Sequence, residues 1–273
     1  MINSNSLNKS FATHKELFRE LKKAEKNIIA AKKASILKSA ERGQLSDVNF
    51  INKDMRADKS VFKDGFVYPV INTTNFLDSH EDVHFPNIWN KTISDKQGKI
   101  YLLADHNSGI SNIVAWPTDV KVFTKMVDWS MVGKNYAGQT QALIYEVAEK
   151  NIQHAQALKF MQEKRPLLGS VAMQYVKIEL AVNSNEHDYI ENKKLWNNKI
   201  NTIANIEDVN EKGYFFAVTE AKIMGEGSIL TTPSNPATQI IYPESQPSNI
   251  DTAKEEPLIS TPNFEDFIQI LNT

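Results

Sequence analysis

The N-terminal part of the chain carries a helical pattern of apolar residues. Between Leu17 and Ala31 these residues recur at spacings of three and four, which places them on one face of a helix. Thr13 and Glu16 have the spacing of a capping box, so the helix is expected to begin just after Thr13, and Gly43 suits a left-handed residue at its end. Two interpretations are open, a helix docked on its own domain or a separate arm that binds a partner. The stripe is narrow and rich in alanine, which favours the arm.

The middle of the chain, from about residue 46 to 237, has the patterns of a folded domain. Short apolar or alternating runs predict β-strands at 66–71, 101–104, 113–116, 120–123, 171–178, 214–218 and 228–230. Residues 140–163 have apolar positions at helical spacing and predict one long helix, whereas 183–206 predict a polar surface excursion with a helical centre. Many strands around one long helix indicate an α+β fold with a mostly antiparallel sheet or a small barrel.

The last part of the chain differs in composition from the rest. Six of the ten prolines follow Thr232, among serine, threonine, asparagine and acidic residues. Such a segment buries too little apolar surface to offset chain entropy, so it is predicted to be disordered. The apolar and acidic segment 264–271 is interpreted as a short linear motif that becomes helical on a partner. The chain is thus divided into a basic helical arm (1–45), a domain (46–237) and an acidic, proline-rich tail (238–273).

Charge is unevenly distributed, although the net charge is only -2 at pH 7. Residues 9–42 contain ten basic and four acidic residues, and 238–273 contain six acidic residues and one lysine. Without an overall basic character, no nucleic-acid partner is expected. The absence of cysteine excludes disulfides, thiolate metal sites and a cysteine nucleophile. Neither a membrane helix of about 20 apolar residues nor a secretory signal is expected, which favours a soluble intracellular protein.

The segment 80–84, His-Glu-Asp-Val-His, matches the H-E-x-x-H pattern. On a helix, His80 and His84 would bind one zinc ion and Glu81 would activate its water. However, Pro86 follows closely and limits such a helix to about two turns. A polar loop with two exposed histidines is therefore favoured. A zinc metalloprotease that uses His80, Glu81 and His84 is kept as an alternative function.

Three separated segments carry a different chemistry. Residues 101–104 are an apolar run that leads to His106, and residues 167–173 place Ser170 directly after a glycine at the start of a strand. Residues 226–236 read Glu-Gly-Ser-Ile-Leu-Thr-Thr-Pro-Ser-Asn-Pro and begin with Glu226. A serine hydroxyl is a weak nucleophile that needs a base within hydrogen-bond reach, and the base needs an orienting partner.

In this order, the segments resemble the prohead maturation proteases of tailed bacteriophages, which are serine proteases with the herpesvirus assemblin-like fold. The resemblance covers about residues 66–238. It also includes an Asp-rich turn at 78–82 followed by Pro-Asn-Ile-Trp at 86–89. The chain departs from the family pattern where a glycine directly precedes Ser170, and where Ala172 and Ser234 stand in place of the usual glycine and alanine.

The resemblance implies a catalytic Ser170 as nucleophile, His106 as general base and Glu226 as the group that orients the base. The herpesvirus relatives use a histidine as third member, so His80 and His84 are the other candidates for that role. The resemblance implies neither a cofactor nor a metal ion.

An oxyanion hole would also be needed, usually built from backbone N–H groups. Sequence alone does not locate such donors. Gly169 and Arg165 lie just upstream of Ser170 and are the nearby candidates.

By the same resemblance, the chain is expected to be a serine endopeptidase that cleaves scaffold and major capsid protein precursors during head assembly. It would act inside the assembling prohead, in the host cell cytoplasm. Scaffold and capsid proteins are the expected substrates or docking partners, a homo-oligomer is left open, and neither nucleic acid nor membrane is expected. The basic helix would recruit the enzyme to acidic scaffold, and the tail would dock to capsid or scaffold or be removed. A non-catalytic capsid or scaffold component is the other alternative.

Overall fold

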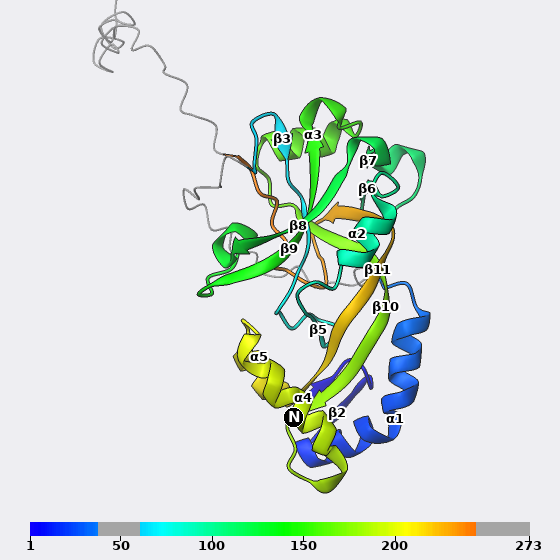
Figure 1. Cartoon of the computed structure of the whole chain (residues 1–273), viewed down its shortest axis with the longest axis vertical. Coiled ribbons are helices and arrows are strands. Elements are labelled where there is room, and N and C mark those ends of the chain that lie inside the picture. Colours follow the sequence, from blue (N-terminus) through cyan, green and yellow to red (C-terminus); the bar gives the residue numbers. More distant parts are fainter. Residues whose placement is uncertain (38–60, 244–273) are drawn as a thin grey trace, which may run out of the picture.

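The computed structural model of the chain describes residues 1–37 and 61–243, which form an α+β fold (Figure 1). Its elements are two β-sheets, an N-terminal β-hairpin and five α-helices. The predicted helix end at Gly43 is wrong, because the N-terminal helix already ends at Ala34, with Ser35 as its C-cap. The predicted tail from residue 244, with the motif at 264–271, lies outside the described residues. Among the residues described, no helix is both long and apolar enough to cross a membrane.

The larger sheet is mixed. Its two long strands, β10 (Leu168–Val182) and β11 (Tyr214–Leu230), pair antiparallel and connect the lower part of the molecule with the upper part (Figure 1). Strand β6 (Tyr101–Ala104) lies parallel to the end of β11 and pairs antiparallel with β7 (Ile113–Ala115). Strand β5 (Asp82–His84) lies parallel to an earlier part of β11. The runs predicted separately at 214–218 and 228–230 therefore belong to one strand.

The second sheet is built around β9 (Gln139–Ala148). Strand β8 (Lys121–Asp128) pairs with one edge of β9, and β3 (Phe66–Val67) and β4 (Val70–Thr73) pair with it as well. All these pairs are antiparallel. The two sheets enclose the main apolar core, to which Ile71 and Val171 both contribute.

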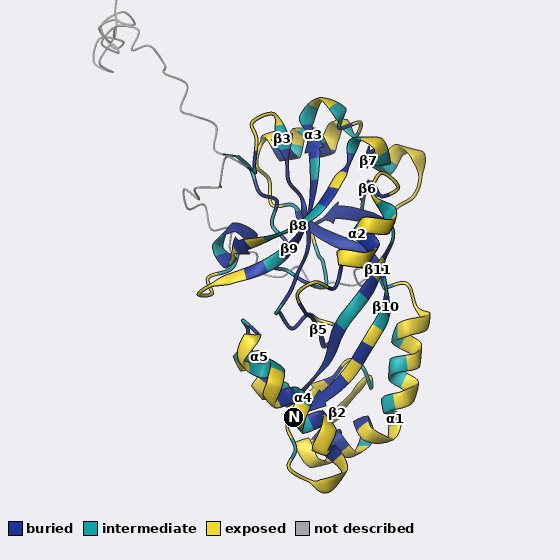
Figure 2. Ribbon diagram, in the orientation of Figure 1, coloured by how far each residue is buried: buried dark blue, intermediate teal, exposed yellow. Residues whose placement is uncertain are grey.

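The predicted helix at 140–163 is wrong in its first half, which is strand β9. This strand is buried over most of its length, as Figure 2 shows. A strand that is buried on both faces has a near-continuous apolar run instead of an alternating one, so periodicity cannot separate it from a helix. A strand is favoured here by the β-branched and aromatic residues Ile144, Tyr145 and Val147. Only α3 (Ala155–Gln162) confirms the helical prediction.

The N-terminal helix α1 (His14–Ala34) is docked on the domain. Thr13 caps it, since the side-chain oxygen accepts a hydrogen bond from the amide of Glu16. Leu17, Phe18 and Leu21 are buried in the main core, and the helix lies along β10 (Figures 1 and 2). The interpretation as a separate arm is therefore wrong, because a few large side chains at the start of the helix bury enough apolar surface to attach it.

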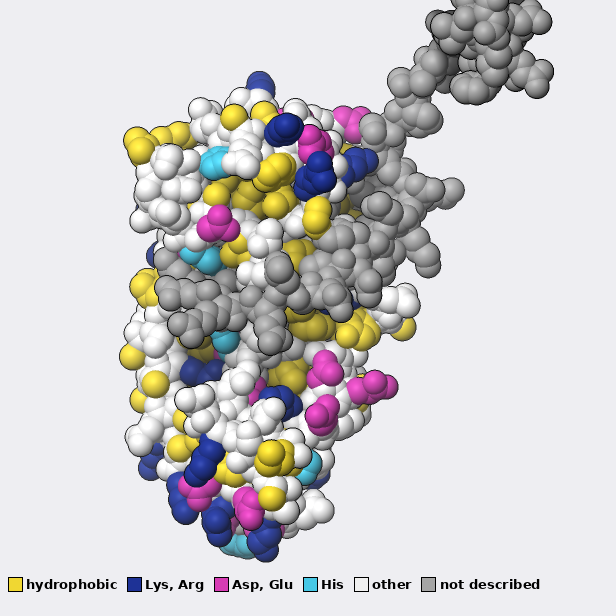
Figure 3. Space-filling model, turned by 180° about the vertical axis from the view of Figure 1, so that it is seen from behind, with side chains coloured by type: hydrophobic (Ala, Val, Ile, Leu, Met, Phe, Trp, Pro, Cys, Tyr) yellow, Lys and Arg dark blue, Asp and Glu magenta, His cyan; other side chains and the backbone are white. Residues whose placement is uncertain are grey.

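The basic residues of α1 are largely paired with acidic ones. Figure 3 shows Lys and Arg side chains interspersed with Asp and Glu at the lower end of the molecule. Lys22 lies 3.0 Å from Glu25, and Lys15 lies 3.3 Å from Glu186. These exposed pairs add little stability, but Glu186 places a negative charge beside the helix that the count over residues 9–42 does not include.

Smaller elements complete the fold. The hairpin consists of β1 (Ile2–Ser4) and β2 (Lys9–Phe11). The remaining helices are α2 (Asn90–Lys96), α4 (Ile190–Lys199) and α5 (Ile206–Lys212). Short 3₁₀ turns occur at Ile110–Asn112, Pro117–Asp119, Trp129–Val132, Glu149–Asn151, His187–Tyr189 and Ile200–Thr202. The predicted excursion at 183–206 with its helical centre is thus present as α4 and its flanking turns.

The chain beyond residue 237 still packs on the domain as far as residue 243. Ile240 and Ile241 are buried. Gln239 bridges to Leu168 at the start of β10, and Ile241 bridges to Tyr68. The predicted boundary at 237 is therefore too early, because the apolar pair at 240–241 belongs to the core and not to the tail.

Candidate active site

His106 is placed by a tight turn at the end of β6. Asp105 and His106 both have positive φ, at 52° and 53°, and the amide of Asn107 closes the turn on the carbonyl of Ala104 at 3.0 Å. Positive φ is uncommon for residues other than glycine and persists where the surrounding structure holds it. The holding contact is a 3.0 Å hydrogen bond from the amide of His106 to the hydroxyl of Ser228 on β11.

Ser170 lies near the start of β10, directly opposite Ser228 in the register with β11. The preceding Gly169 sits so close to β4 that a Cβ there would lie 1.9 Å from the carbonyl oxygen of Val70. Only glycine allows this approach. Packing therefore explains why a glycine directly precedes Ser170: it lets the strand that carries Ser170 lie close against the second sheet.

Glu226 is positioned by an irregularity in β11. Val171 pairs with Gly227, but the next pair joins Met173 to Ile223, so β11 has two more residues than β10 over this stretch. Such a bulge bends the strand and changes the direction of the side chains within it. Gly225, with φ of +86°, supplies the left-handed backbone directly before Glu226.

The structure brings Ser170, His106 and Glu226 into one hydrogen-bonded chain. His106 Nδ1 lies 2.7 Å from Glu226 Oε1, and His106 Nε2 lies 2.9 Å from Ser170 Oγ. A carboxylate can only accept, so Nδ1–H donates to Glu226. In the neutral imidazole Nε2 is then the acceptor, and the Ser170 hydroxyl donates to it. This is the arrangement that activates a serine hydroxyl.

The group is largely enclosed, with Ser170 6% and Glu226 7% exposed. Enclosure strengthens electrostatic interactions because little water competes for them. Behind Glu226 lies the phenol of Tyr145, whose pKa is raised well above its usual value by burial and further by the charge of Glu226. The phenol is therefore neutral and adds no second negative charge to the site.

Ser228 also belongs to this site, although no role was predicted for it. Its hydroxyl donates to Glu226 Oε2 at 2.9 Å while it accepts from the amide of His106 at 3.0 Å. The side chain is fully buried. One hydroxyl thus holds both the carboxylate and the turn that carries the imidazole. The sequence signal that indicates this role is the position of Ser228 two residues after Glu226, because residues two apart on a strand face the same side.

The two nearby candidates for oxyanion-hole donors are wrong. The amide of Gly169 donates to the carbonyl of Thr238 at 3.0 Å. The amide of Arg165 donates to the carbonyl of Phe160, and its Nε donates to Glu163. Proximity in sequence gave no information on where these N–H groups point, because strand pairing and the helix end already use them.

The residues of the H-E-x-x-H pattern do not form a zinc-binding helix. Asp82 and His84 lie on strand β5, and Glu81 has a positive φ of 64°. The Glu81 carboxylate accepts hydrogen bonds from the amides of Asn5 and Ser6 and so fastens the N-terminal hairpin. The expectation of two exposed histidines is also wrong, since His84 is only 2% exposed and His80, which does lie in a turn, is only partly exposed.

His84 is the centre of a buried hydrogen-bond chain. The Asn72 amide donates to His84 Nδ1 at 2.9 Å, and His84 Nε2–H donates to the Tyr175 hydroxyl at 3.0 Å. Tyr175 in turn donates to Asp82 at 2.8 Å. Burial, followed by the positive charges of His80 and Lys32, lowers the pKa of His84 to about 3. His84 is therefore a neutral structural residue, and Glu226, not His80 or His84, contacts His106.

Comparisons with protein-family models, with curated proteins and with solved structures found no match to this chain.

Proposed function

We propose that the protein is a serine endopeptidase with Ser170 as nucleophile, His106 as general base and Glu226 as the orienting carboxylate. The observation that carries this proposal is the continuous hydrogen-bonded chain from Ser170 Oγ through the imidazole of His106 to Glu226. Both distances lie in the range required of a nucleophile and its base. The three groups come from residues more than 50 positions apart, and each is held by contacts of its own.

The proposed reaction proceeds in two stages. Ser170 Oγ attacks the carbonyl carbon of the scissile peptide bond while its proton moves to His106 Nε2. The imidazolium, stabilised by Glu226, then gives this proton to the leaving amine and an acyl-enzyme forms. In the second stage, water attacks the ester carbonyl and gives its proton to Nε2. Ser170 then leaves as the alcohol after taking back that proton, and the carboxylic acid product is released.

The choice of substrate is supported by the resemblance in motif order to phage prohead maturation proteases. The proposed substrates are scaffold protein and the precursor of the major capsid protein, cleaved during head assembly inside the prohead in the host cytoplasm. A peptide bond of a capsid or scaffold protein meets the requirement for a carbonyl that a serine can attack. Because α1 is docked on the domain and its basic residues are largely paired, recruitment of the enzyme to scaffold by this helix is not part of the proposal.

The test is co-expression of the full chain with its capsid and scaffold proteins, followed by mass spectrometry of the products. We expect the wild type to yield shortened capsid and scaffold chains and Ser170→Ala to yield only full-length ones. Ser111→Ala is the matched control, because Ser111 is exposed on a turn a few residues after His106 and makes no contact with the triad atoms. Unchanged processing by Ser170→Ala would contradict the proposal and favour the non-catalytic capsid or scaffold component.

A further inference from the structure

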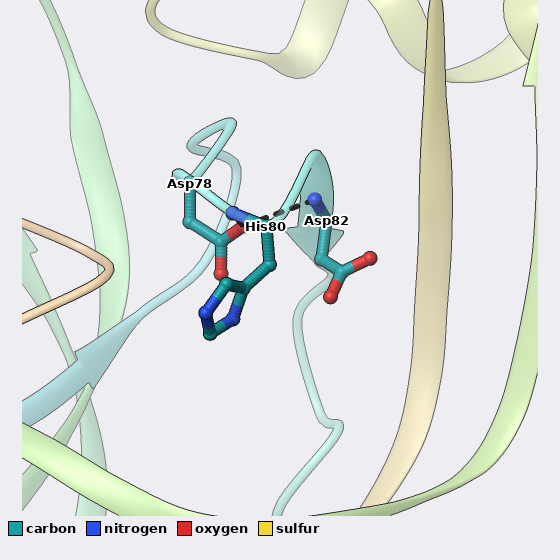
Figure 4. A group of neighbouring side chains, drawn as sticks. All are labelled: Asp78, His80 and Asp82. Atoms are coloured by element: carbon teal, nitrogen blue, oxygen red, sulfur yellow. Dashed lines mark hydrogen bonds between the residues drawn. The ribbon is translucent and has the colours of Figure 1, made fainter. Parts of the chain in front are cut away.

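A second cluster of polar side chains lies in the turn that leads into β5. Asp78, His80 and Asp82 each offer one potential ligand atom, and these atoms lie within 4.8 Å of one another. Figure 4 shows the three side chains projecting to the same side of the turn. Asp78 is 6% exposed and Asp82 is fully buried. This cluster is separate from the proposed triad, because β5 pairs with β11 about ten residues before Glu226, or about 30 Å along the strand.

Two atoms of the cluster are buried without a hydrogen-bond partner. Asp78 Oδ1 accepts from the amides of His80 and Asp82, at 2.9 and 3.0 Å, and so stabilises the turn. By contrast, Asp78 Oδ2 and His80 Nδ1 have no partner, although both are shielded from solvent. A buried polar atom without a partner costs about 1–3 kcal/mol, and more where charge is involved. The turn therefore leaves one carboxylate oxygen and one imidazole nitrogen of the cluster buried and unsatisfied.

The charges of the cluster are not balanced by the side chains around it. Asp82 Oδ1 accepts from the ammonium of Lys32 at 2.6 Å, and Asp82 Oδ2 accepts from the Tyr175 hydroxyl at 2.8 Å. Lys32 supplies one positive charge for two carboxylates. The cluster thus needs one more positive charge, which either a proton or a metal ion would supply.

We propose that Asp78, His80 and Asp82 bind a divalent transition-metal ion, for which Zn²⁺ is the best-matched candidate. Imidazole nitrogen and carboxylate oxygen are both ligand types that zinc accepts, and water can supply the fourth ligand, whereas Ca²⁺ and Mg²⁺ take oxygen ligands. Zinc–ligand bonds of 2.0–2.2 Å place tetrahedral ligand atoms about 3.4 Å apart, whereas the three atoms lie within 4.8 Å of one another, so they need to close by up to about 1.4 Å. Each oxygen of Asp82 has a second lone pair, which allows Lys32 to stay.

This site uses His80 of the H-E-x-x-H pattern without Glu81 or His84. Its surroundings give it a structural role, because Lys32 of α1 and Glu81, which holds the N-terminal hairpin, meet at the same turn. An ion bound there would fasten the turn to β5 and, through Lys32, to α1. Because metal binding to the folded chain stabilises it, we expect the thermal midpoint to rise with zinc concentration.

The test uses the purified full chain after treatment with a chelator and its removal. We expect titration calorimetry to show one Zn²⁺ bound per chain, elemental analysis to give the same ratio, and bound Co²⁺ to give the absorption bands of a tetrahedral site. Asp78→Asn keeps an oxygen for the amides of His80 and Asp82 but removes the metal-binding carboxylate. His80→Gln removes the imidazole. Each variant is expected to bind Zn²⁺ at least tenfold more weakly.

The control is His187→Gln, which changes an exposed histidine outside the cluster and is expected to bind zinc as the wild type does. Absence of stoichiometric binding by the wild type would overturn the proposal. So would binding that is retained by either Asp78→Asn or His80→Gln. If the wild type binds no zinc and Asp78→Asn is more stable than the wild type, a proton on Asp78 neutralises the cluster instead. None of these results depends on peptidase activity, so they are independent of the proposed function.

Discussion

Replacing Ser228 by alanine tests how the proposed active site is held together. The wild-type hydroxyl donates to Glu226 Oε2 and accepts from the amide of His106, and its side chain is fully buried. The variant leaves a carboxylate oxygen and a backbone N–H without these partners, at a place that water does not easily reach. The carboxylate is then free to turn away from Nδ1, and the turn that carries His106 loses its anchor.

The expected magnitude follows from the hydrogen bond to the charged group. Such a bond contributes about 1.5–3 kcal/mol. If this energy is lost from the transition state, where the imidazolium forms against Glu226, the rate falls about 10- to 150-fold, since 1.36 kcal/mol corresponds to a factor of ten. The variant still contains the nucleophile Ser170 and the base His106, so it is expected to be slow but not inactive.

The assay is phosphonylation of Ser170 by a fluorophosphonate, in which the Oγ–P bond forms as fluoride leaves, followed as the mass increase of the intact chain. The second-order rate constant of Ser228→Ala is compared with that of the wild type. Thr140→Val is the matched control, because Thr140 has a buried hydroxyl that exchanges hydrogen bonds with Thr74 and none with the triad. The control is expected to lose stability but to keep its labelling rate. A rate for Ser228→Ala within twofold of the wild type, in a folded protein, would refute the positioning role.

Two further predictions concern stability. Gly169→Ala would bring a Cβ to 1.9 Å from the Val70 carbonyl oxygen, so we expect a loss of about 3 kcal/mol or more in the free energy of unfolding; an unchanged thermal midpoint would contradict this reason for glycine. The pKa of His84 is about 3 in the folded chain, whereas its ordinary value is 6.5. As the pH falls, the unfolded chain therefore takes up a proton at His84 before the folded chain does. This lowers the free energy of unfolding by about 2 kcal/mol between pH 7.5 and 5. His84→Gln should lose less stability over this interval in urea unfolding, and an equal loss would exclude His84 as the cause.

Local sequence patterns predicted several elements correctly. The capping box at Thr13 begins α1, and the alternating run at 171–178 lies within β10. The apolar run Tyr101–Ala104 is strand β6. In each case the residues that decide the conformation lie within a few positions of one another, so the pattern is complete in the sequence.

Errors arose where burial by distant parts of the chain decides the conformation. Strand β9 is covered on both sides and loses the alternation that identifies a strand. The docking of α1 depends on the surface that β10 offers to Leu17, Phe18 and Leu21. Neither the environment of β9 nor the partner of α1 is visible from residues nearby in sequence.

The sequence by itself determined which side chains are available for chemistry and which classes are excluded. It contains no cysteine, and it places His106 after an apolar strand, Ser170 after a glycine, and Glu226 two residues before a serine. These are matters of composition and of neighbouring residues.

Only the tertiary structure decided that these groups meet. Pairing of β6 and β10 with opposite sides of β11 brings His106 and Ser170 together, and the bulge in β11 aims Glu226 at the imidazole. It also decided that His80 lies with Asp78 and Asp82, while Glu81 and His84 have other partners. The physical reason is that strand register and backbone irregularities orient side chains, and both depend on contacts between segments far apart in the chain.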